Sequence, residues 1–108
     1  MDIAGFSDIA LSFPNTEQVP HFDRIGFKVI GRRMFASCLD KDNTANIFLT
    51  PSEQKVFCKV DRKNIFPVPN KWGEKGITTF KLQEVSRDIL HEALLSAYND
   101  VVKSSKKK

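Results

Sequence analysis

The stretch PNKWGEKGITTFKL, residues 69–82, marks where the last part of the fold begins. It contains the only tryptophan of the chain, Trp72, and two of its five glycines, Gly73 and Gly76. Glycine adopts backbone conformations that other residues avoid, so this pair indicates a constrained turn around Trp72. Residues 77–82 are predicted to form the last strand of a sheet, and one long amphipathic helix should follow them.

A helix is predicted at each end of the chain. Asp2 is a suitable N-cap for the first helix, residues 2–13, and Pro14 should end it. The last helix begins after the cap Ser86 and carries apolar side chains every three to four residues. It should pack across one face of the sheet with the stripe Val85, Ile89, Leu90, Ala93, Leu94, Ala97, Tyr98, Val101 and Val102.

The middle helix has the clearest local signal in the chain. Thr50 and Glu53 have the spacing of a capping box, and a proline follows Thr50 at the first helical position. The helix is predicted to run to about Val60 and to bury Val56, Phe57 and Val60.

The remaining segments indicate strands joined mostly by short turns. Prolines within the first and fifth of these segments predict that the first is an edge strand and the fifth an edge or connecting stretch. A run of hairpins combined with helices indicates a two-layer α+β fold, in which an antiparallel sheet has its helices on one face. The predicted strands cover residues 19–24, 26–30, 33–39, 44–49, 65–69 and 77–82.

The length of the chain and the distribution of its charges limit how it can be divided into domains. A chain of 108 residues is expected to form one domain, residues 1–102, followed by a basic disordered tail, residues 103–108. The chain has 17 basic and 13 acidic residues, and four of the lysines lie in this tail, so residues 1–102 are neutral. No apolar run reaches the ~20 residues of a membrane span, and no signal peptide is recognisable. A cytoplasmic protein without membrane contact is therefore expected.

Sites for metals and for enzyme chemistry are not predicted. A calcium loop beginning at Asp40 and containing Asp42 would place glycine and glutamate where Ala45 and Pro51 stand. No phosphate-binding glycine loop, HExxH or CxxC motif occurs. Cys38 and Cys58 lie far apart in apolar runs, where buried free thiols are expected, and the other cysteines needed for a metal site are missing. The sequence thus indicates a non-enzymatic protein without a cofactor.

Several segments, in their order and spacing over residues 8–102, resemble the MmcQ/YjbR family. The chain departs from the family pattern at Ile77, where a second aromatic residue is expected. The matching segments are ALSFP (10–14), HF (21–22), GFKV (26–29), Phe35, NKWGEKGIT (70–78) and LLSAY (94–98).

The resemblance implies a CyaY-like fold, with an antiparallel sheet and helices on one side. It also implies DNA binding, through the "double wing" description that the family carries. The related frataxin-type fold binds iron through an acidic ridge, but residues 2–13 contain only Asp2 and Asp8 as acids. Iron binding is therefore not expected.

Basic residues crowd one predicted hairpin and also flank Trp72. A groove that follows a nucleic-acid backbone uses cations for phosphates and aromatic rings for base stacking. The alternative for the hairpin is a solvated sheet edge, and the alternative for Trp72 is an inward-packed anchor of its loop. His21 is interpreted as a polar groove contact, and His91 as an exposed helix residue. The candidate nucleic-acid-binding residues are Arg24, Lys28, Arg32, Arg33, Lys71, Trp72 and Lys75.

Two functions remain open from the sequence. One is weak, sequence-independent DNA binding through the basic hairpin and the Trp72 loop. The other is a protein-interaction module that holds a peptide or a subunit at the sheet face, without nucleic acid. Local basic clustering favours the first, and the neutrality of residues 1–102 favours the second. A surface on which the basic residues merge into one stripe would support DNA binding, whereas scattered positions would remove its physical basis.

Overall fold

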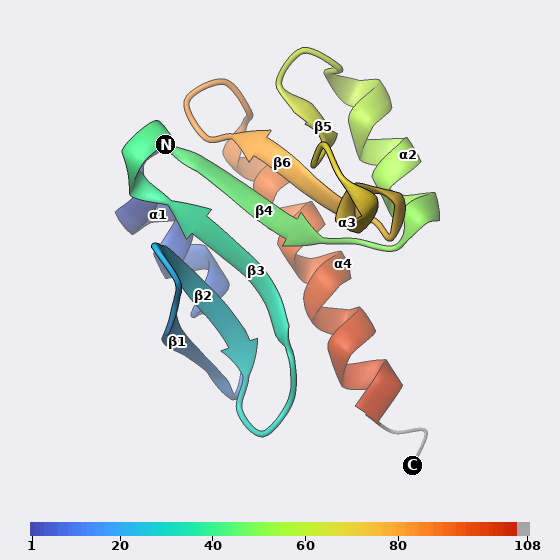
Figure 1. Ribbon diagram of the computed structural model, residues 1–108. Coiled ribbons are helices and arrows are strands. Elements are labelled where there is room, and N and C mark those ends of the chain that lie inside the picture. Colours follow the sequence, from blue (N-terminus) through green and yellow to red (C-terminus); the bar gives the residue numbers. More distant parts are fainter. Residues whose placement is uncertain (106–108) are drawn as a thin grey trace.

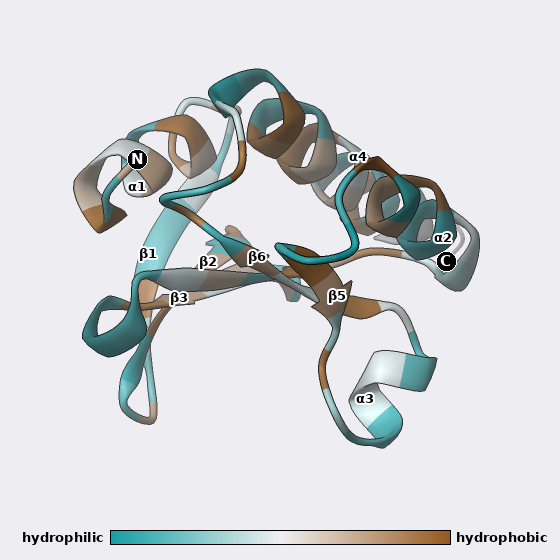
Figure 2. Ribbon diagram, turned by 90° about the horizontal axis from the view of Figure 1, so that it is seen from above, coloured by the Kyte–Doolittle hydropathy of each residue, from teal (hydrophilic) through white to brown (hydrophobic). Residues whose placement is uncertain are grey.

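Six antiparallel strands form one sheet in the order β1-β2-β3-β4-β6-β5. Helices α1, α2 and α4 cover one face of this sheet, and the short helix α3 lies on the other side (Figures 1 and 2). The computed structural model describes residues 1–105, with side chains through Lys103. The predicted two-layer α+β fold is confirmed. Its elements are α1 (Ile3–Ala10), β1 (Thr16–His21), β2 (Arg24–Val29), β3 (Met34–Leu39), a 3₁₀ turn (Asp40–Asp42), β4 (Thr44–Phe48), α2 (Pro51–Val60), β5 (Ile65–Pro67), α3 (Lys71–Glu74), β6 (Ile77–Lys81) and α4 (Arg87–Ser105).

Some predicted boundaries were wrong. The first helix ends at Ala10 instead of residue 13, because the Ser12 hydroxyl donates a hydrogen bond to the Ile9 carbonyl, 2.6 Å, and the chain turns there. The last helix continues to Ser105, so residues 103–105 are helical and do not belong to a disordered tail. No glycine or proline interrupts this helix, and Lys103 in its last turn interacts favourably with the helix dipole. Residues 106–108 of the predicted tail lie outside the described part of the chain.

The core lies between the sheet and its helix layer. The Phe6 ring of α1 meets Phe27 of β2 edge to face, with ring centres 5.8 Å apart. Phe13 stacks on Tyr98 of α4 at 5.0 Å and so joins the α1 end to the last helix. The apolar stripe predicted for the last helix is confirmed in six of its nine members, which are buried; Val85 lies just before α4, and the others lie within it: Leu90, Ala93, Leu94, Ala97 and Val101.

The capping box of α2 is present, but its predicted buried face was wrong. Val56 and Val60 are 64% and 56% exposed, whereas Phe57 packs against Phe80 of β6 with ring centres 6.2 Å apart. The helix lies at the β5–β6 end of the sheet, at the margin of the helix layer, and packs mainly on these two strands (Figure 2). The residue that α2 buries is the polar Gln54.

The two cysteines are free thiols. Cys38 is buried, and burial raises the pKa of its thiol to about 11. Cys58 on α2 is partly buried, so the prediction of a buried thiol is confirmed for Cys38 and only in part for Cys58. No helix within residues 1–105 is long and apolar enough to cross a membrane.

Replacing Asp100 with asparagine should stabilise the protein at neutral pH. Burial and the nearby Glu53 carboxyl raise the pKa of Asp100 from 3.8 to about 6. The folded state therefore binds this proton more tightly than the unfolded chain, and the free energy of unfolding falls as pH rises from about 4 to about 6. Because Asp100 keeps some contact with water, the expected gain at pH 7 is about 1–2 kcal/mol, measured by chemical denaturation at several pH values.

The exposed Glu92 of the same helix provides the control. Glu92→Gln should leave both the free energy of unfolding and its pH dependence between pH 4 and 6 nearly unchanged. An Asp100→Asn protein with the same pH dependence as the unmodified chain would contradict this assignment.

Candidate functional site

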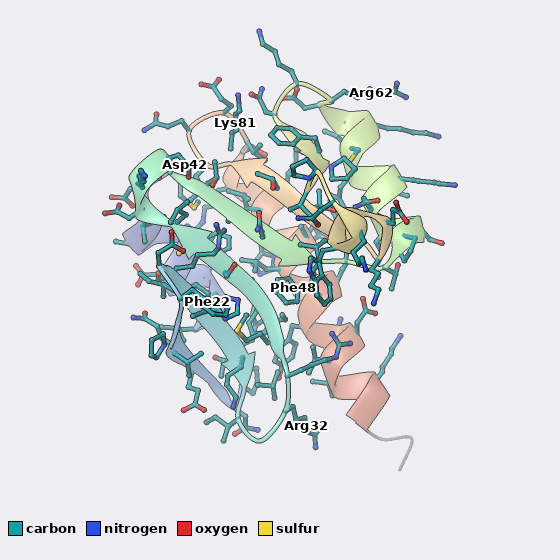
Figure 3. The ribbon with its side chains drawn as sticks, in the orientation of Figure 1. Phe22, Arg32, Asp42, Phe48, Arg62 and Lys81 are labelled. Atoms are coloured by element: carbon teal, nitrogen blue, oxygen red, sulfur yellow. The ribbon has the colours of Figure 1, made fainter. Side chains whose placement is uncertain are left out.

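The sheet face opposite α1, α2 and α4 is hollowed into a groove of about 930 Å³. Figure 3 looks onto this face. Phe48 and Ile77 are register partners on its floor, so Ile77 lies on the groove surface at the place where the family resemblance predicts an aromatic residue. A second row of partners crosses the sheet beside them: Gly26, Ser37, Asn46, Thr79 and Phe66.

The groove floor is mixed in polarity. Thr79 Oγ1 donates a hydrogen bond to Asn46 Oδ1, 2.8 Å, and so holds the Asn46 amide group in place. No side-chain acceptor is described for Asn46 Nδ2, which leaves a donor at the groove surface. Met34 lies over the position where Gly26 lacks a side chain, since a Cβ there would come within 2.7 Å of its sulfur. The floor thus offers apolar area with a few hydrogen-bonding groups, as small-ligand and peptide sites commonly do.

Two exposed aromatic residues belong to the loops on either side of the groove. Phe22 occupies the tight turn between β1 and β2 and is 94% exposed. Trp72 belongs to α3 and is 53% exposed, and it lines the groove. The alternative weighed for Trp72, an inward-packed anchor of its loop, does not hold. Partly buried Phe48 and Phe66 lie on the floor between these loops, so the groove has aromatic surface although Ile77 contributes none.

The backbone of Phe22 has an unusual conformation. Its φ is 60°, in the left-handed region, and its neighbours His21 and Arg24 are the register partners that close the hairpin. Glycine normally takes such a turn position, and a side chain there costs roughly 1–2 kcal/mol. A bulky ring in this strained and solvent-exposed geometry contributes nothing to the core, so packing does not explain its presence in the turn.

Phe22→Gly should make the protein more stable. Relief of the left-handed strain exceeds the extra backbone entropy of glycine in the unfolded chain, so we expect a gain of about 0.5–1 kcal/mol in the free energy of unfolding. The control Ile30→Gly removes another exposed apolar side chain where no positive φ is recorded, and it should destabilise the fold. Urea denaturation measures both, and a destabilised Phe22→Gly protein would show that the ring supports the fold.

The Trp72 segment is held rigidly against the sheet. Asn70 caps α3 by accepting a hydrogen bond from the Trp72 backbone N–H, 2.9 Å. Buried Gln54 reaches from α2 and donates through Nε2 to the Gly73 carbonyl at 2.9 Å and to Thr78 Oγ1 at 3.1 Å. The predicted constrained turn is confirmed, and it presents Trp72 outward.

Arg24 lies at the β2 side of the groove without a carboxylate partner. Its Nε donates to Ser37 Oγ, 2.9 Å. Its Nη2 is covered by neighbouring atoms and has no hydrogen-bond partner among the described residues. The salt bridge found in this part of the chain joins Lys28 to Glu17 at 3.9 Å and does not involve Arg24.

The predicted basic residues do not form one stripe. Of the predicted site residues, His21, Arg24 and Trp72 line the groove. Arg32 lies at the tip of the β2–β3 hairpin and points away from the sheet (Figure 3). Arg33, in the same turn, lies close enough to Asp100 of α4 for its charge to oppose part of the pKa rise that burial and Glu53 cause in that carboxyl, so it lies near the last helix and not in the groove. Of the two arrangements considered from the sequence, the basic residues therefore have the scattered one.

The cations around α3 accompany the Trp72 ring. Lys75 Nζ lies 5.0 Å from the centre of this ring, which is cation–π geometry. Lys71, the first residue of α3, is exposed and does not line the groove. Lys28 is partly neutralised by Glu17. These lysines adjoin the groove edge or lie outside it, and none of them lines its floor.

Sequence reasoning missed the residues that join the two sides of the groove. Ser37, Asn46 and Thr79 lie on neighbouring strands and face the same side, but the strand order needed to bring them together was not evident. Phe22 had a usable signal, since an aromatic residue stands between the strand-ending His21 and Arg24. Within the described residues no group of three or more histidine, cysteine or acidic side chains could hold a metal ion.

No protein-family model matches the chain, and no curated protein matches it in sequence. Its structure is similar to the crystal structure of protein DR2400 from Deinococcus radiodurans, with a TM-score of 0.81 and 21% sequence identity. The match covers 96% of this chain and 80% of that one, which contains a domain of the DUF419 family. DUF419 is the MmcQ/YjbR family, and the chain therefore has the fold of the family that its sequence resembles.

Proposed function

We propose that this chain is a non-enzymatic protein-interaction module that holds an extended peptide segment of a partner in the groove. The observation that carries the proposal is the pair of outward aromatic side chains, Phe22 in the β1–β2 turn and Trp72 in α3, beside a sheet face that offers apolar area with a few hydrogen-bonding groups. Aromatic and arginine side chains dominate the binding energy of protein interfaces. Apolar side chains displayed together on a folded domain commonly mark such a site.

The charge of the groove supports a protein partner over a polyanion. Arg24 and Lys81 line it, and so do Asp42 and Glu84, so the two signs balance. Figure 3 shows Asp42 and Lys81 near one another at one end of the sheet. A nucleic-acid backbone presents repeated negative charges and is bound by several cations in succession. The free thiols Cys38 and Cys58 are also in keeping with a reducing compartment such as the cytoplasm.

Selection from a random-peptide display library tests the proposal. The full chain should enrich related peptides, and a groove variant with Phe22→Ser and Trp72→Ser should bind them at least about ten-fold more weakly. The control variant Val56→Ser with Val60→Ser removes two similarly exposed apolar side chains from α2. It should bind as the unmodified chain does. The proposal would be contradicted if no related peptides were enriched. It would also be contradicted if the enriched peptides bound the groove variant as tightly as the unmodified chain and lost binding to the control variant.

Sequence-independent DNA binding is the second candidate, and the Lys75–Trp72 pair is the observation that favours it. The test measures binding of labelled single- and double-stranded DNA across salt, with Lys106, Lys107 and Lys108 changed to glutamine in one variant. If the groove and the Trp72 loop do not bind DNA, any weak DNA binding comes from these lysines and should disappear in the variant. Retained affinity with a log–log salt slope of several units, about −0.9 per neutralised phosphate on duplex, would favour DNA instead.

A further inference from the structure

Resting on the proposed function, we propose that the groove recognises a carboxylate of the bound peptide through Arg24. The carboxylate belongs to an acidic side chain or to the C-terminus of the peptide. An adjacent apolar or aromatic side chain of the peptide packs near Phe22. The bound peptide must therefore carry a carboxylate, and Arg24 determines this specificity.

The guanidinium of Arg24 is incompletely paired. A guanidinium has five N–H donors in a planar fork, and the described residues supply an acceptor for Nε alone. The Nη2 group is covered without a partner, which is costly for a charged donor. No carboxylate of the described residues lies within salt-bridge distance of this side chain. Arg24 thus has unused capacity for an anion.

The Arg24 side chain lies where a ligand in the groove can reach it. Arg24 lines the groove and keeps part of its surface exposed, so a ligand can reach the guanidinium. Ser37 fixes its Nε and orients the fork. An entering acceptor meets the exposed part of the guanidinium first and pairs with Nη2 once the covering side chains shift. Two parallel N–H···O bonds to a carboxylate are the geometry that arginine favours.

The β1–β2 turn beside Arg24 carries an exposed aromatic ring. Phe22 stands two residues before Arg24, and its ring centre lies 4.9 Å from that of His21, which also lines the groove. An exposed ring two residues along the chain from a guanidinium with unused donors suits an apolar group followed by an anion. The acidic groove residues Asp42 and Glu84 oppose a run of negative charges, so one carboxylate fits better than a polyanion.

The probes are N-acetyl-L-phenylalanine and its amide, which differ in the carboxylate alone. Each is titrated into the uniformly ¹⁵N-labelled full chain at pH 7 and constant ionic strength, and backbone amide shifts are followed. The acid should move the amides of His21, Arg24 and Ser37 in a saturable way. The amide probe should bind about ten-fold more weakly, because a charge-assisted pair is lost.

Two variants with the same charge change locate the site. Arg24→Gln should weaken binding of the acid about ten-fold and make the two probes equal, whereas Arg32→Gln at the hairpin tip should change binding less than about two-fold. Thermal unfolding of both variants shows whether the fold persists, and Arg24→Lys retains the charge without the fork and should recover part of the affinity.

The outcomes separate this inference from the proposed function. Equal binding of acid and amide in the groove, or no groove shift with either, overturns carboxylate recognition, while the peptide selection still decides whether the groove binds peptides. Inorganic phosphate that moves the same amides as strongly as the acid would assign the site to small anions and would also overturn it. Carboxylate recognition is supported if Arg24→Gln loses the preference for the acid over the amide and Arg32→Gln keeps it.

Discussion

Gly76→Ala should lower the free energy of unfolding by about 3 kcal/mol or more. Gly76 has a φ of +116°, which a residue with a side chain rarely adopts. A Cβ at this position would overlap the Leu49 carbonyl oxygen and lie 2.8 Å from the Leu49 carbonyl carbon. These atoms belong to the backbone between β4 and α2, so neither side can yield without moving the sheet or the helix. Urea denaturation followed by the fluorescence of Trp72 measures the change.

Gly31→Ala provides a matched control for the conformational part of this cost. Gly31 also has a positive φ, +79°, but a Cβ there would meet no atom within 4 Å. It should therefore lose only about 1–2 kcal/mol, the cost of the left-handed conformation. Equal losses in the two variants would contradict the claim that close packing against Leu49 fixes the start of β6.

Gln54→Leu should lower the free energy of unfolding by about 2–3 kcal/mol and loosen the Trp72 segment. Gln54 Nε2 donates to the carbonyls of Gly73 and Ile77, at 2.9 and 3.3 Å, and to Thr78 Oγ1 at 3.1 Å. Leucine has a similar size but no donor, so buried acceptors lose their partner. Urea denaturation measures the stability, and acrylamide quenching of Trp72 fluorescence should rise as the segment moves more freely.

The control for Gln54→Leu is Lys55→Leu on the exposed side of the same helix. It retains helix propensity and should change stability by less than about 0.5 kcal/mol, with unchanged quenching of Trp72. If Gln54→Leu were as stable as Lys55→Leu, the hydrogen bonds from α2 would not be what positions Trp72.

Local signals predicted much of the fold because each depends on a few neighbouring residues. The Thr50–Glu53 capping box and the apolar repeat of α4 are decided within one or two turns of helix, and both are confirmed. The repeat at Val56 and Val60 misled because periodicity shows which side chains share a helix face, and does not show whether another element covers that face. The open side of α2 depends on where the helix meets the sheet.

The candidate groove was harder to predict because it is made by tertiary pairing. His21, Arg24 and Trp72 were predicted as separate groove or nucleic-acid contacts, and all three line one groove because β1, β2 and α3 are brought to the same sheet face. Arg33 was grouped with Arg24 by sequence proximity, yet it does not line the groove, and its charge acts on Asp100 of α4. A bulge between Phe27 and Lys28 changes the register along this hairpin, and sequence patterns did not indicate it.

The central claim is that the open sheet face binds the partner, and paramagnetic relaxation tests it most directly. A peptide selected on the full chain is given a nitroxide label and mixed with ¹⁵N-labelled protein. The account predicts that amides of Phe22, Asn46 and Trp72 broaden strongly while those of Val56 and His91, away from the groove, stay sharp. Broadening centred on α2 or α4 with a sharp Asn46 signal would contradict it.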